Sequence, residues 1–313
     1  MTAPGDPTGD DPAGAGRAVQ VVQPGPLTLV QDAGRPGRAH LGVGASGAMD
    51  RAALALGNRL VGNPDDAAGL EILLGGVRLR FGAHGWIALT GAWLPAKLHG
   101  ASGDGGGHWW VEPHTATAVE PGDELELEVA THGIRGYLAV RGGVDVPPVL
   151  GSRSRDVLAA LGPAPLAAGD LLPVGPEPTD PVPPVDLVPV DPPPDGEVVL
   201  GIRPGPRRDW ITDAAWDALR GPGWSVSPRS DRTGVRLDGP ALEWVERREL
   251  PSEGMLPGAI QVSPDGAPTI LGPDHPVTGG YPVAAVVVDA SLDALAQLRP
   301  GQRVRLMLVG GRP

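Results

Sequence analysis

A strand that runs directly into a turn carrying an amide, a carboxylate and a guanidinium offers the first candidate chemistry. These groups are Gln31, Asp32 and Arg35, within the segment Gln31–Gly37. A guanidinium can hold a carboxylate or a phosphate through two parallel hydrogen bonds while a neighbouring amide fixes the ligand's orientation. The same residues could instead form an ordinary turn with an internal Asp32–Arg35 pair, and the turn taken alone favours that second interpretation.

Loops rich in glycine, serine and arginine at the ends of other predicted elements are further candidate anion sites. Ser46 lies in a glycine-rich segment that leads into a helix start, where backbone N–H groups can bind an anion. Arg141 and Ser152 occupy loops that follow a strand in the first half, and Arg203 and Arg232 occupy comparable loops in the second half. In a chain of net charge −12 these loops indicate local anion recognition, although each alone has an ordinary structural interpretation.

A loop between two prolines in the second half has the backbone freedom to approach a ligand closely. Gly279 and Gly280 permit positive φ and leave backbone N–H groups uncovered, and Thr278 and Tyr281 flank them. We expect this loop to line a cleft near Gln261 and to bind substrate together with it. The alternative is a β-turn with the Tyr281 ring in the core.

Several standard catalytic and metal-binding patterns are absent from the sequence. It has no P-loop, no HExxH, no GxSxG and no cysteine, which excludes thiolate catalysis and cysteine-ligated zinc. His108, Glu112 and His114 could share one face of a strand, but no further ligand accompanies them, so we predict no metal site. Lys97 is the only lysine, and any chemistry that needs a lysine must use it or come from another chain.

Charge and hydropathy exclude other classes of protein. The 313 residues carry 25 basic and 37 acidic side chains, and such a surface repels nucleic acid and anionic lipid. No apolar run reaches the roughly 18 residues of a membrane-spanning helix. The N-terminus also lacks the basic-then-apolar order of a secretory signal. We therefore expect a cytoplasmic protein without a nucleic-acid or membrane partner.

The pattern of apolar residues predicts a mainly β fold with a few short helices. Glu124–Val129 alternates strictly between charged and apolar residues, as does a strand with one wet face. Pro264-Asp265-Gly266 between two apolar runs predicts a hairpin. Helices are expected over Asp50–Val61, Arg155–Leu161, Trp210–Leu219 and Leu292–Leu298.

Two segments of low hydrophobicity divide the chain. Residues 1–17 are small, polar and acidic, which predicts a disordered tail. Residues 175–196 contain nine prolines, which predict an extended, semi-rigid linker. The linker would separate an N-terminal β-barrel-like domain at 18–174 from a C-terminal β-barrel-like domain at 197–313, unless it lies across the surface of one domain.

Taken together, these segments resemble the biotin-dependent carboxyltransferase family, also called allophanate hydrolase subunit 2. The resemblance extends from about Val21 to Val309 and implies cyclophilin-like β-barrel domains. Its motifs in this sequence are Gln31–Gly37, Ser46–Asp50, Asn58–Asn63, Leu70-Glu71, Ala88–Ala92, Tyr137–Val140, Gly142-Gly143, Leu150–Ser154, Ser252–Gly254, Gly258–Val262, Thr278–Pro282 and Leu295–Gln297.

The resemblance implies a role as the C-type component of an ATP-dependent 5-oxoprolinase, which opens the lactam of 5-oxoproline to give glutamate. Such a component would be active only with a B-type and an A-type partner, and would use ATP, with magnesium expected. We expect Arg35, Asp32 and Arg232 to be catalytic. Substrate binding is expected from Gln31, Ser46, Arg141, Ser152, Arg203, Gln261, Thr278, Gly279, Gly280 and Tyr281.

Two other functions fit the same resemblance. One is carboxyl transfer from carboxybiotin to a small amide, as in urea carboxylase; no covalent biotin is expected on this chain, which lacks a Met-Lys-Met carrier motif. The other is a non-enzymatic regulatory role, as the binding partner of a kinase inhibitor related to the B-type component. Arg155 and His275-Pro276-Val277 depart from the usual family pattern and leave the substrate open.

Overall fold

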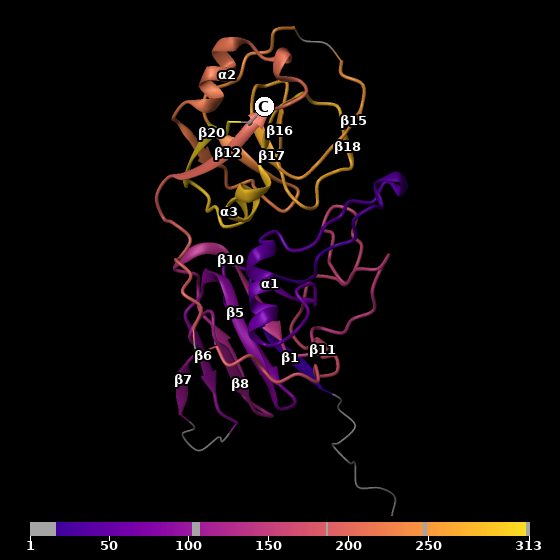
Figure 1. The fold of residues 1–313 in the computed structure, drawn as a ribbon, viewed down its shortest axis with the longest axis vertical. Helices are drawn as coiled ribbons and strands as arrows, with labels where there is room; N and C mark the ends of the chain where they lie inside the picture. The colour runs from indigo at the N-terminus through magenta and orange to yellow at the C-terminus, as the bar shows by residue number, and fades with distance from the viewer. Residues whose placement is uncertain (1–16, 102–106, 186, 247–248, 311–313) are drawn as a thin grey trace, which may run out of the picture.

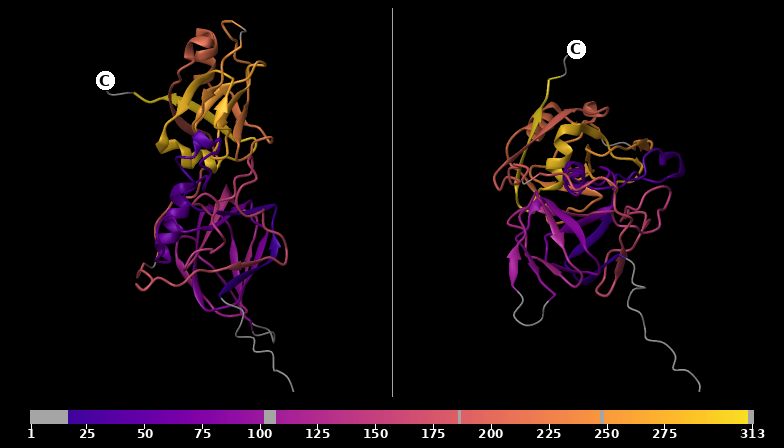
Figure 2. Two further views of the ribbon diagram at one scale, coloured as in Figure 1. Left: turned by 90° about the vertical axis from the view of Figure 1, so that its right-hand side faces the viewer. Right: turned by 60° about the horizontal axis from the view of Figure 1, so that its bottom comes forward.

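The computed structural model describes residues 17–101, 107–185, 187–246 and 249–310. It has two lobes stacked along the longest axis, with the earlier strands in one lobe and the later strands in the other (Figures 1 and 2). We call these the N-terminal and C-terminal lobes. The predicted tail at 1–17 lies outside the described residues except for Arg17. The mainly β prediction is confirmed.

The N-terminal lobe consists of two sheets in the described part of the chain. The six-stranded sheet has the order β11 (Leu171–Pro173), β1 (Ala18–Pro24), β4 (Val77–Phe81), β9 (Glu124–Leu127), β6 (Ala96–His99) and β7 (His108–Trp110). The five-stranded sheet has the order β2 (Leu27–Gln31), β3 (Gly69–Leu73), β10 (His132–Val140), β5 (Gly85–Trp93) and β8 (Ala116–Val119). Apolar side chains from both sheets form one buried core.

Apolar and charged residues alternate along the strands of the six-stranded sheet, so one face of the sheet is buried and the other is exposed. In β4 the side chain of Leu79 is fully buried, whereas those of Arg78 and Arg80 face outward. The neighbouring strand β9 places Glu124 next to both arginines, which form ion pairs with it. Lys97 of β6 likewise donates to the Glu128 carboxylate at 2.6 Å. Opposite charges therefore cover the outer face of this sheet.

The C-terminal lobe is built around a closed β-barrel. The strands pair in the order β12 (Val198–Pro204), β19 (Val283–Val287), β16 (Ala259–Val262), β17 (Pro268–Leu271), β14 (Gly234–Asp238), β13 (Trp224–Val226) and β20 (Arg303–Leu308). The parallel pairing of β12 with β20 closes it. The predicted hairpin is confirmed, with Ile260 opposite Ile270. A separate pair joins β15 (Glu253–Gly254) to β18 (Thr278–Gly279).

Three of the four predicted helices form. They are α1 (Arg51–Leu60), α2 (Asp213–Arg220) and α3 (Leu292–Ala296), and the short 3-10 turns are Ala39–Leu41, Arg208–Trp210 and Asp289–Ser291. Asp50, where the predicted helix begins, caps α1, because its carboxylate accepts from the Ala53 backbone N–H at 2.9 Å. Among the residues that the structure describes, no helix has the length and apolar character needed to cross a membrane.

The predicted helix over Arg155–Leu161 is wrong, because this segment forms a tight turn. The Asp156 carboxylate accepts from the Ala159 backbone N–H at 2.9 Å, and Asp156 pairs with Leu161 as an isolated bridge. Ala160 has a φ of 54°, which an α-helix does not allow. A side chain that bonds its own backbone competes with helix formation in this way.

The proline-rich segment 175–196 is fixed to both lobes. The Arg141 guanidinium of the N-terminal lobe donates to the Pro178 carbonyl at 2.8 Å. The Val188 backbone N–H donates to the His114 carbonyl at 3.2 Å. In the C-terminal lobe, the Gln302 amide donates to the Pro194 carbonyl at 2.6 Å. The segment therefore lies against the N-terminal lobe before it reaches β12, and its role as a domain boundary stays a prediction.

The turn between β3 and β4 contains two adjacent glycines, and substituting each of them tests the geometry of this turn. A Cβ on Gly75, where φ is 91°, would lie 2.0 Å from the Glu128 carbonyl oxygen, whereas a Cβ on Gly76 meets no atom closer than 4.0 Å. We expect Gly76→Ala to lower the free energy of unfolding by about 1 kcal/mol, from backbone strain alone. Gly75→Ala should cost about 3 kcal/mol, because it adds a backbone clash. Urea denaturation measures both, and equal losses would contradict the turn geometry.

Candidate functional site

A buried set of charged side chains joins the two lobes. Arg232 of the C-terminal lobe donates through Nη1 to Glu71 Oε1 at 2.6 Å and through Nε to Asp274 Oδ2 at 2.8 Å. Arg232, Glu71 and Asp274 are each at most 4% exposed. One guanidinium is thus held by two carboxylates in a place that water hardly reaches.

Neighbouring strands position the carboxylate of Glu71. Glu71 lies in β3 between fully buried apolar residues and stands opposite Tyr137 of β10. The Tyr137 hydroxyl donates to Glu71 Oε2 at 2.7 Å, and the Met49 backbone N–H donates to the same oxygen at 2.9 Å. Together with Arg232 at Oε1, these contacts present a donor to each oxygen of a carboxylate that is only 4% exposed.

These contacts determine the protonation states in the network. Burial alone would raise the pKa of Glu71, but the positive charges of Arg232 and Arg135 outweigh burial and lower it below its usual value. Burial opposes the charge on Arg232, yet the two carboxylates outweigh it and raise the pKa of the guanidinium. Burial and the charge of Glu71 raise the pKa of Tyr137, so its phenol stays protonated and donates.

A second part of the network reaches α1 and α3. Gln297, just after α3, donates through Nε2 to Asp50 Oδ2 at 2.7 Å. Its Oε1 accepts from the Arg135 backbone N–H at 3.1 Å. The Arg135 guanidinium donates through Nη1 to the Ala296 carbonyl at 2.6 Å and lies 3.7 Å from Glu71 Oε1. Both lobes therefore supply groups to one continuous set of hydrogen bonds.

A cavity of about 460 Å³ lies beside this network. Glu71, Arg135 and Arg232 line it together with Ser230 and Asp231, and its other walls are mainly apolar. Arg232 is already engaged by two carboxylates and by the Gly47 carbonyl. Arg135 has only the carbonyl bond and the longer ion pair among the contacts of the described residues. Of the two guanidiniums, Arg135 is the better placed to accept an anionic ligand.

The Gln31–Gly37 turn contacts the segment 149–155. Asp32 Oδ1 accepts from the Ser152 hydroxyl at 2.6 Å and from the Ser154 hydroxyl at 2.5 Å, and Oδ2 accepts from the Arg153 backbone N–H. Arg35 is 2% exposed, and its Nε donates to the Val149 carbonyl at 3.3 Å. The internal Asp32–Arg35 pair that the sequence left open does not form in the described structure, where each side chain bonds this distant segment instead.

Gln31 and Ser46 lie near the same segment. The Gln31 amide donates to the Arg155 carbonyl at 2.8 Å, while its buried Oε1 has no partner among the described residues. The Ser46 hydroxyl donates to Asp274 Oδ1 at 2.6 Å. Ser46 is thus joined to Arg232 through Asp274, so the structure brings together two of the predicted site residues.

Two other predicted arginines lie apart from this network. Arg141 is buried, and its Nη1 donates to the Val61 carbonyl at 2.7 Å while its Nη2 bonds the proline-rich segment. Arg203 is exposed on β12. Their contacts give Arg141 a structural role in the described chain, and the predicted substrate roles of both residues stay predictions.

The loop 278–281 lies beside Gln261, as expected, and the cleft that it was expected to line stays a prediction. Gln261 Nε2 donates to the Tyr281 carbonyl at 3.3 Å, and a Cβ on Gly279 would lie 2.6 Å from the same nitrogen. Tyr281 is 47% exposed, so the alternative that placed its ring in the core is wrong. Thr278 and Gly280 are also exposed. Their role in substrate binding stays a prediction.

Six residues of the buried network were not predicted as site residues from the sequence, namely Asp50, Glu71, Arg135, Tyr137, Asp274 and Gln297. The available signal was a charged residue inside an apolar run, as in Leu70-Glu71-Ile72-Leu73. Such a charge in a strand buried on both faces requires a partner of opposite charge. The sequence alone does not tell which of the 24 arginines that partner is.

Known proteins resemble this chain over most of its length. Residues 41–308 match the family model of the carboxyltransferase domain, subdomains A and B. The chain belongs to this carboxyltransferase family. The match agrees with the resemblance inferred from the sequence motifs.

Three relatives of this carboxyltransferase-family chain are informative. It is 38% identical to the C component of 5-oxoprolinase from Escherichia coli (strain K12), covering 92% of this chain and 90% of that protein. It is 33% identical to the Haemophilus influenzae protein of the same name, covering 90% and 87%. The solved structure of K. lactis urea amidolyase superposes with a TM-score of 0.85 at 30% identity, covering 94% of this chain but 19% of that one.

The buried Asp50 predicts a pH dependence of stability. Burial raises the pKa of Asp50 from 3.8 to about 6, against the lowering effect of the Gln297 and Ala53 hydrogen bonds. Because the folded pKa is the higher one, the stabilising contribution is complete below about pH 4 and is lost as the pH rises through 6. About two pKa units correspond to roughly 3 kcal/mol.

The wild-type chain should lose this contribution as the pH rises, and Asp50→Asn should not. We therefore expect the free energy of unfolding of Asp50→Asn, minus that of the wild-type chain, to increase by about 2–3 kcal/mol from pH 4 to pH 8. Urea unfolding at several pH values measures this difference. Its change with pH is the informative quantity, because any effect of the altered Gln297 contact that does not depend on pH cancels. Asp66→Asn, an exposed change of equal charge, is the control. A flat difference for Asp50→Asn would show that this carboxyl titrates normally.

Proposed function

We propose that this carboxyltransferase-family chain is the C component of an ATP-dependent 5-oxoprolinase. The observation that carries the proposal is the nearly end-to-end match with the E. coli protein, 92% of one chain against 90% of the other. The match to urea amidolyase covers only 19% of that chain, and its 30% identity is lower than the 38% identity to the E. coli protein.

The chemistry of the substrate gives the described cavity a role in this proposal. A lactam is a stable amide, so opening it requires activation, and phosphorylation of the amide oxygen by ATP would ease cleavage of the C–N bond. The carboxylate of 5-oxoproline needs a cation, which Arg135 offers beside the 460 Å³ cavity. Arg232 would act by fixing Glu71 and Asp274 rather than by contacting the substrate.

The proposal also requires partner chains. The sequence has no P-loop, and its single lysine, Lys97, is engaged with Glu128 in the N-terminal lobe. Groups that bind the phosphates of ATP, with magnesium, would therefore come largely from the B-type and A-type partners. The E. coli relative is by its name one subunit of an enzyme, which supports a multi-subunit assembly.

Reconstitution tests this function directly. The chain is mixed with its B-type and A-type partners, ATP, magnesium and 5-oxoproline, and glutamate is measured. We expect glutamate only when all three chains and ATP are present. We also expect Arg135→Lys to raise the KM for 5-oxoproline more than it lowers kcat, because the lysine keeps the charge but loses the fork geometry. A well-folded complex that forms no glutamate would overturn the proposal.

A second candidate is carboxyl transfer from carboxybiotin to a small amide. It is favoured by the TM-score of 0.85 against urea amidolyase. Biotin would arrive on another polypeptide. Incorporation of labelled bicarbonate in the presence of a biotin carboxylase and a biotinylated carrier, without glutamate formation from 5-oxoproline, would support this function over the first. A stable complex with the B-type partner that lacks both activities would support the regulatory role instead.

A further inference from the structure

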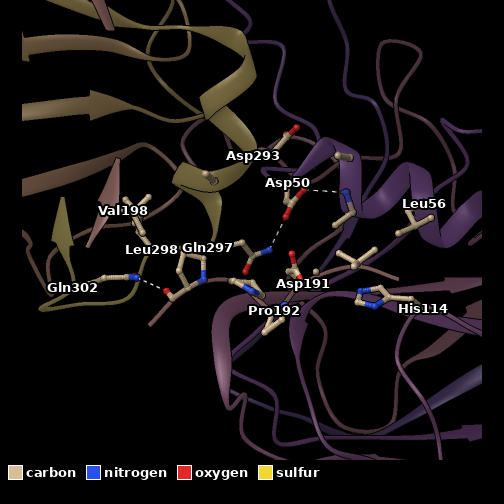
Figure 3. A pocket seen from close by; sticks show the side chains of 17 residues that line it. Asp50, Leu56, His114, Asp191, Pro192, Val198, Asp293, Gln297, Leu298 and Gln302 are labelled. Carbon is tan, nitrogen blue, oxygen red and sulfur yellow. Dashed lines mark hydrogen bonds between the residues drawn. The ribbon is translucent and has the colours of Figure 1, made fainter. Parts of the chain in front are cut away.

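A second cavity, of about 610 Å³, lies between the two lobes (Figure 3). Helix α1 contributes Ala52 and Leu56, the proline-rich segment contributes Pro192 and Pro193, and α3 contributes Ala294. These walls are mainly apolar, and they come from three parts of the chain that are distant in sequence. A cavity of this size and character can enclose a small organic molecule.

The His114 side chain, which lines this cavity, has no hydrogen-bond or ion-pair partner among the described residues. His114 is 3% exposed, and Figure 3 shows its ring turned toward the space enclosed by the lining residues. Its backbone is held on both sides, since its N–H donates to the Leu89 carbonyl at 2.8 Å and its carbonyl accepts from the Val188 N–H. Within the described part of the chain, no residue forms a hydrogen bond or an ion pair with the imidazole.

The nitrogens of the His114 ring are open to the cavity, since neither is a fully buried atom without a partner. Burial lowers the pKa of His114, so the ring is neutral at pH 7 and presents one donor and one acceptor nitrogen. A ligand in the cavity can therefore form a hydrogen bond with the ring.

The charges around the cavity indicate the sign of the ligand. Asp50, Asp191 and Asp293 line it, and none of its described lining residues is a lysine or an arginine. Asp50 is bonded to Gln297 and Ala53, and Asp293 accepts from the Arg51 backbone and also pairs with the Arg51 guanidinium at 3.5 Å. Asp191 has no contact of this kind among the described residues and remains available. Two of these carboxyl groups, Asp50 and Asp191, have no cation partner among the described residues, and in a largely apolar space they favour a positively charged ligand.

We propose that this cavity binds a small primary amine with an apolar body. The ammonium lies near Asp50 and Asp191, one of its hydrogens bonds the acceptor nitrogen of His114, and the apolar body packs against Leu56 and Pro192. This site lies beside the Arg135 cavity: Leu298 lines both cavities, and Gln297 lines this one and accepts from the Arg135 backbone. The proposal does not rest on the 5-oxoprolinase activity, because the ligand contacts neither Arg135 nor Arg232.

Three indole compounds that differ in one group test the proposal on the full chain. Isothermal titration calorimetry at pH 7.5 compares tryptamine, its alcohol analogue tryptophol, and indole-3-propionate. We expect tryptamine to bind at least about tenfold more tightly than tryptophol, and the carboxylate to bind more weakly still. Equal affinities for the three compounds, or no binding of tryptamine, would overturn the proposal.

Paired variants locate the binding. Ala52→Phe fills the cavity, whereas Ala55→Phe changes the same helix at a residue outside the lining, so only the first should abolish tryptamine binding. Asp191→Asn should weaken tryptamine binding about fivefold and leave tryptophol unchanged, while the exposed Asp66→Asn should change neither. Because Asp191 and Asp66 are both exposed, these variants should fold normally. Tryptamine affinity that is unaltered in Ala52→Phe and in Asp191→Asn would place binding elsewhere and refute the site.

Discussion

Replacing Arg232 by methionine is expected to lower the free energy of unfolding by about 3–5 kcal/mol. The change leaves the carboxylates of Glu71 and Asp274 buried, at 4% and 1% exposure, without the cation that both contact. Methionine has a similar length and is apolar, so the loss reports the stranded charges rather than a large void. Equilibrium unfolding in urea, followed by tryptophan fluorescence, measures it.

Two further variants define the origin of that loss. Arg203→Met removes an exposed arginine of the same lobe and should change stability by less than about 0.5 kcal/mol. The double variant Arg232→Met with Glu71→Gln removes one stranded charge and should recover part of the stability. If the double variant were no more stable than Arg232→Met, the coupling between Arg232 and Glu71 would be refuted.

Asp32→Ala is expected to lower the free energy of unfolding by on the order of 3 kcal/mol, because several buried donors lose their acceptor together. These donors are the backbone N–H of Gly34, the hydroxyls of Ser152 and Ser154, and the Arg153 backbone N–H. The carboxylate is therefore the main link between the Gln31–Gly37 turn and the distant segment 149–155.

Limited trypsin digestion gives this prediction a local readout. The segment contains Arg153 and Arg155, so its release should accelerate cleavage after these residues in Asp32→Ala under conditions that leave the wild-type chain intact. Asp32→Asn keeps one acceptor oxygen and should fall between the two, and Asp66→Ala serves as the surface control. Unchanged cleavage in a destabilised Asp32→Ala would show that the carboxylate stabilises something other than this segment.

The elements that the sequence predicted well are those specified by neighbouring residues. The hairpin between β16 and β17 follows from Pro264-Asp265-Gly266, and the start of α1 follows from Asp50 as N-cap. The turn at Asp156 was predicted as a helix because its spacing of apolar residues is also compatible with one. There the side chain of Asp156 bonds the local backbone, and a hydrophobic pattern does not register that competition.

The site was harder to predict because its contacts join residues that are far apart in sequence. Arg232 lies 161 positions from Glu71, and Asp32 lies 120 positions from Ser152. The sequence motifs predicted polar and charged site residues. In the structure, several of these side chains bond to other parts of the chain and do not face a cavity. Arg35, for example, is buried against the Val149 carbonyl. Both Arg135 and Arg232 line the cavity, and only the packing of the two lobes shows that Arg232 is already engaged by two carboxylates while Arg135 has fewer partners.

The separation between Glu71 and Arg232 also has a consequence for the order in which the chain is made. A ribosome adds roughly 5–20 residues per second, so the 161 residues between them take roughly 8–30 s to synthesise. During that interval the strands around Glu71 can pair while its cation does not yet exist. The newly made N-terminal lobe must therefore keep this carboxylate protonated, hydrated or paired with Arg135 until the second lobe arrives. Docking of the lobes would then be the step that neutralises it.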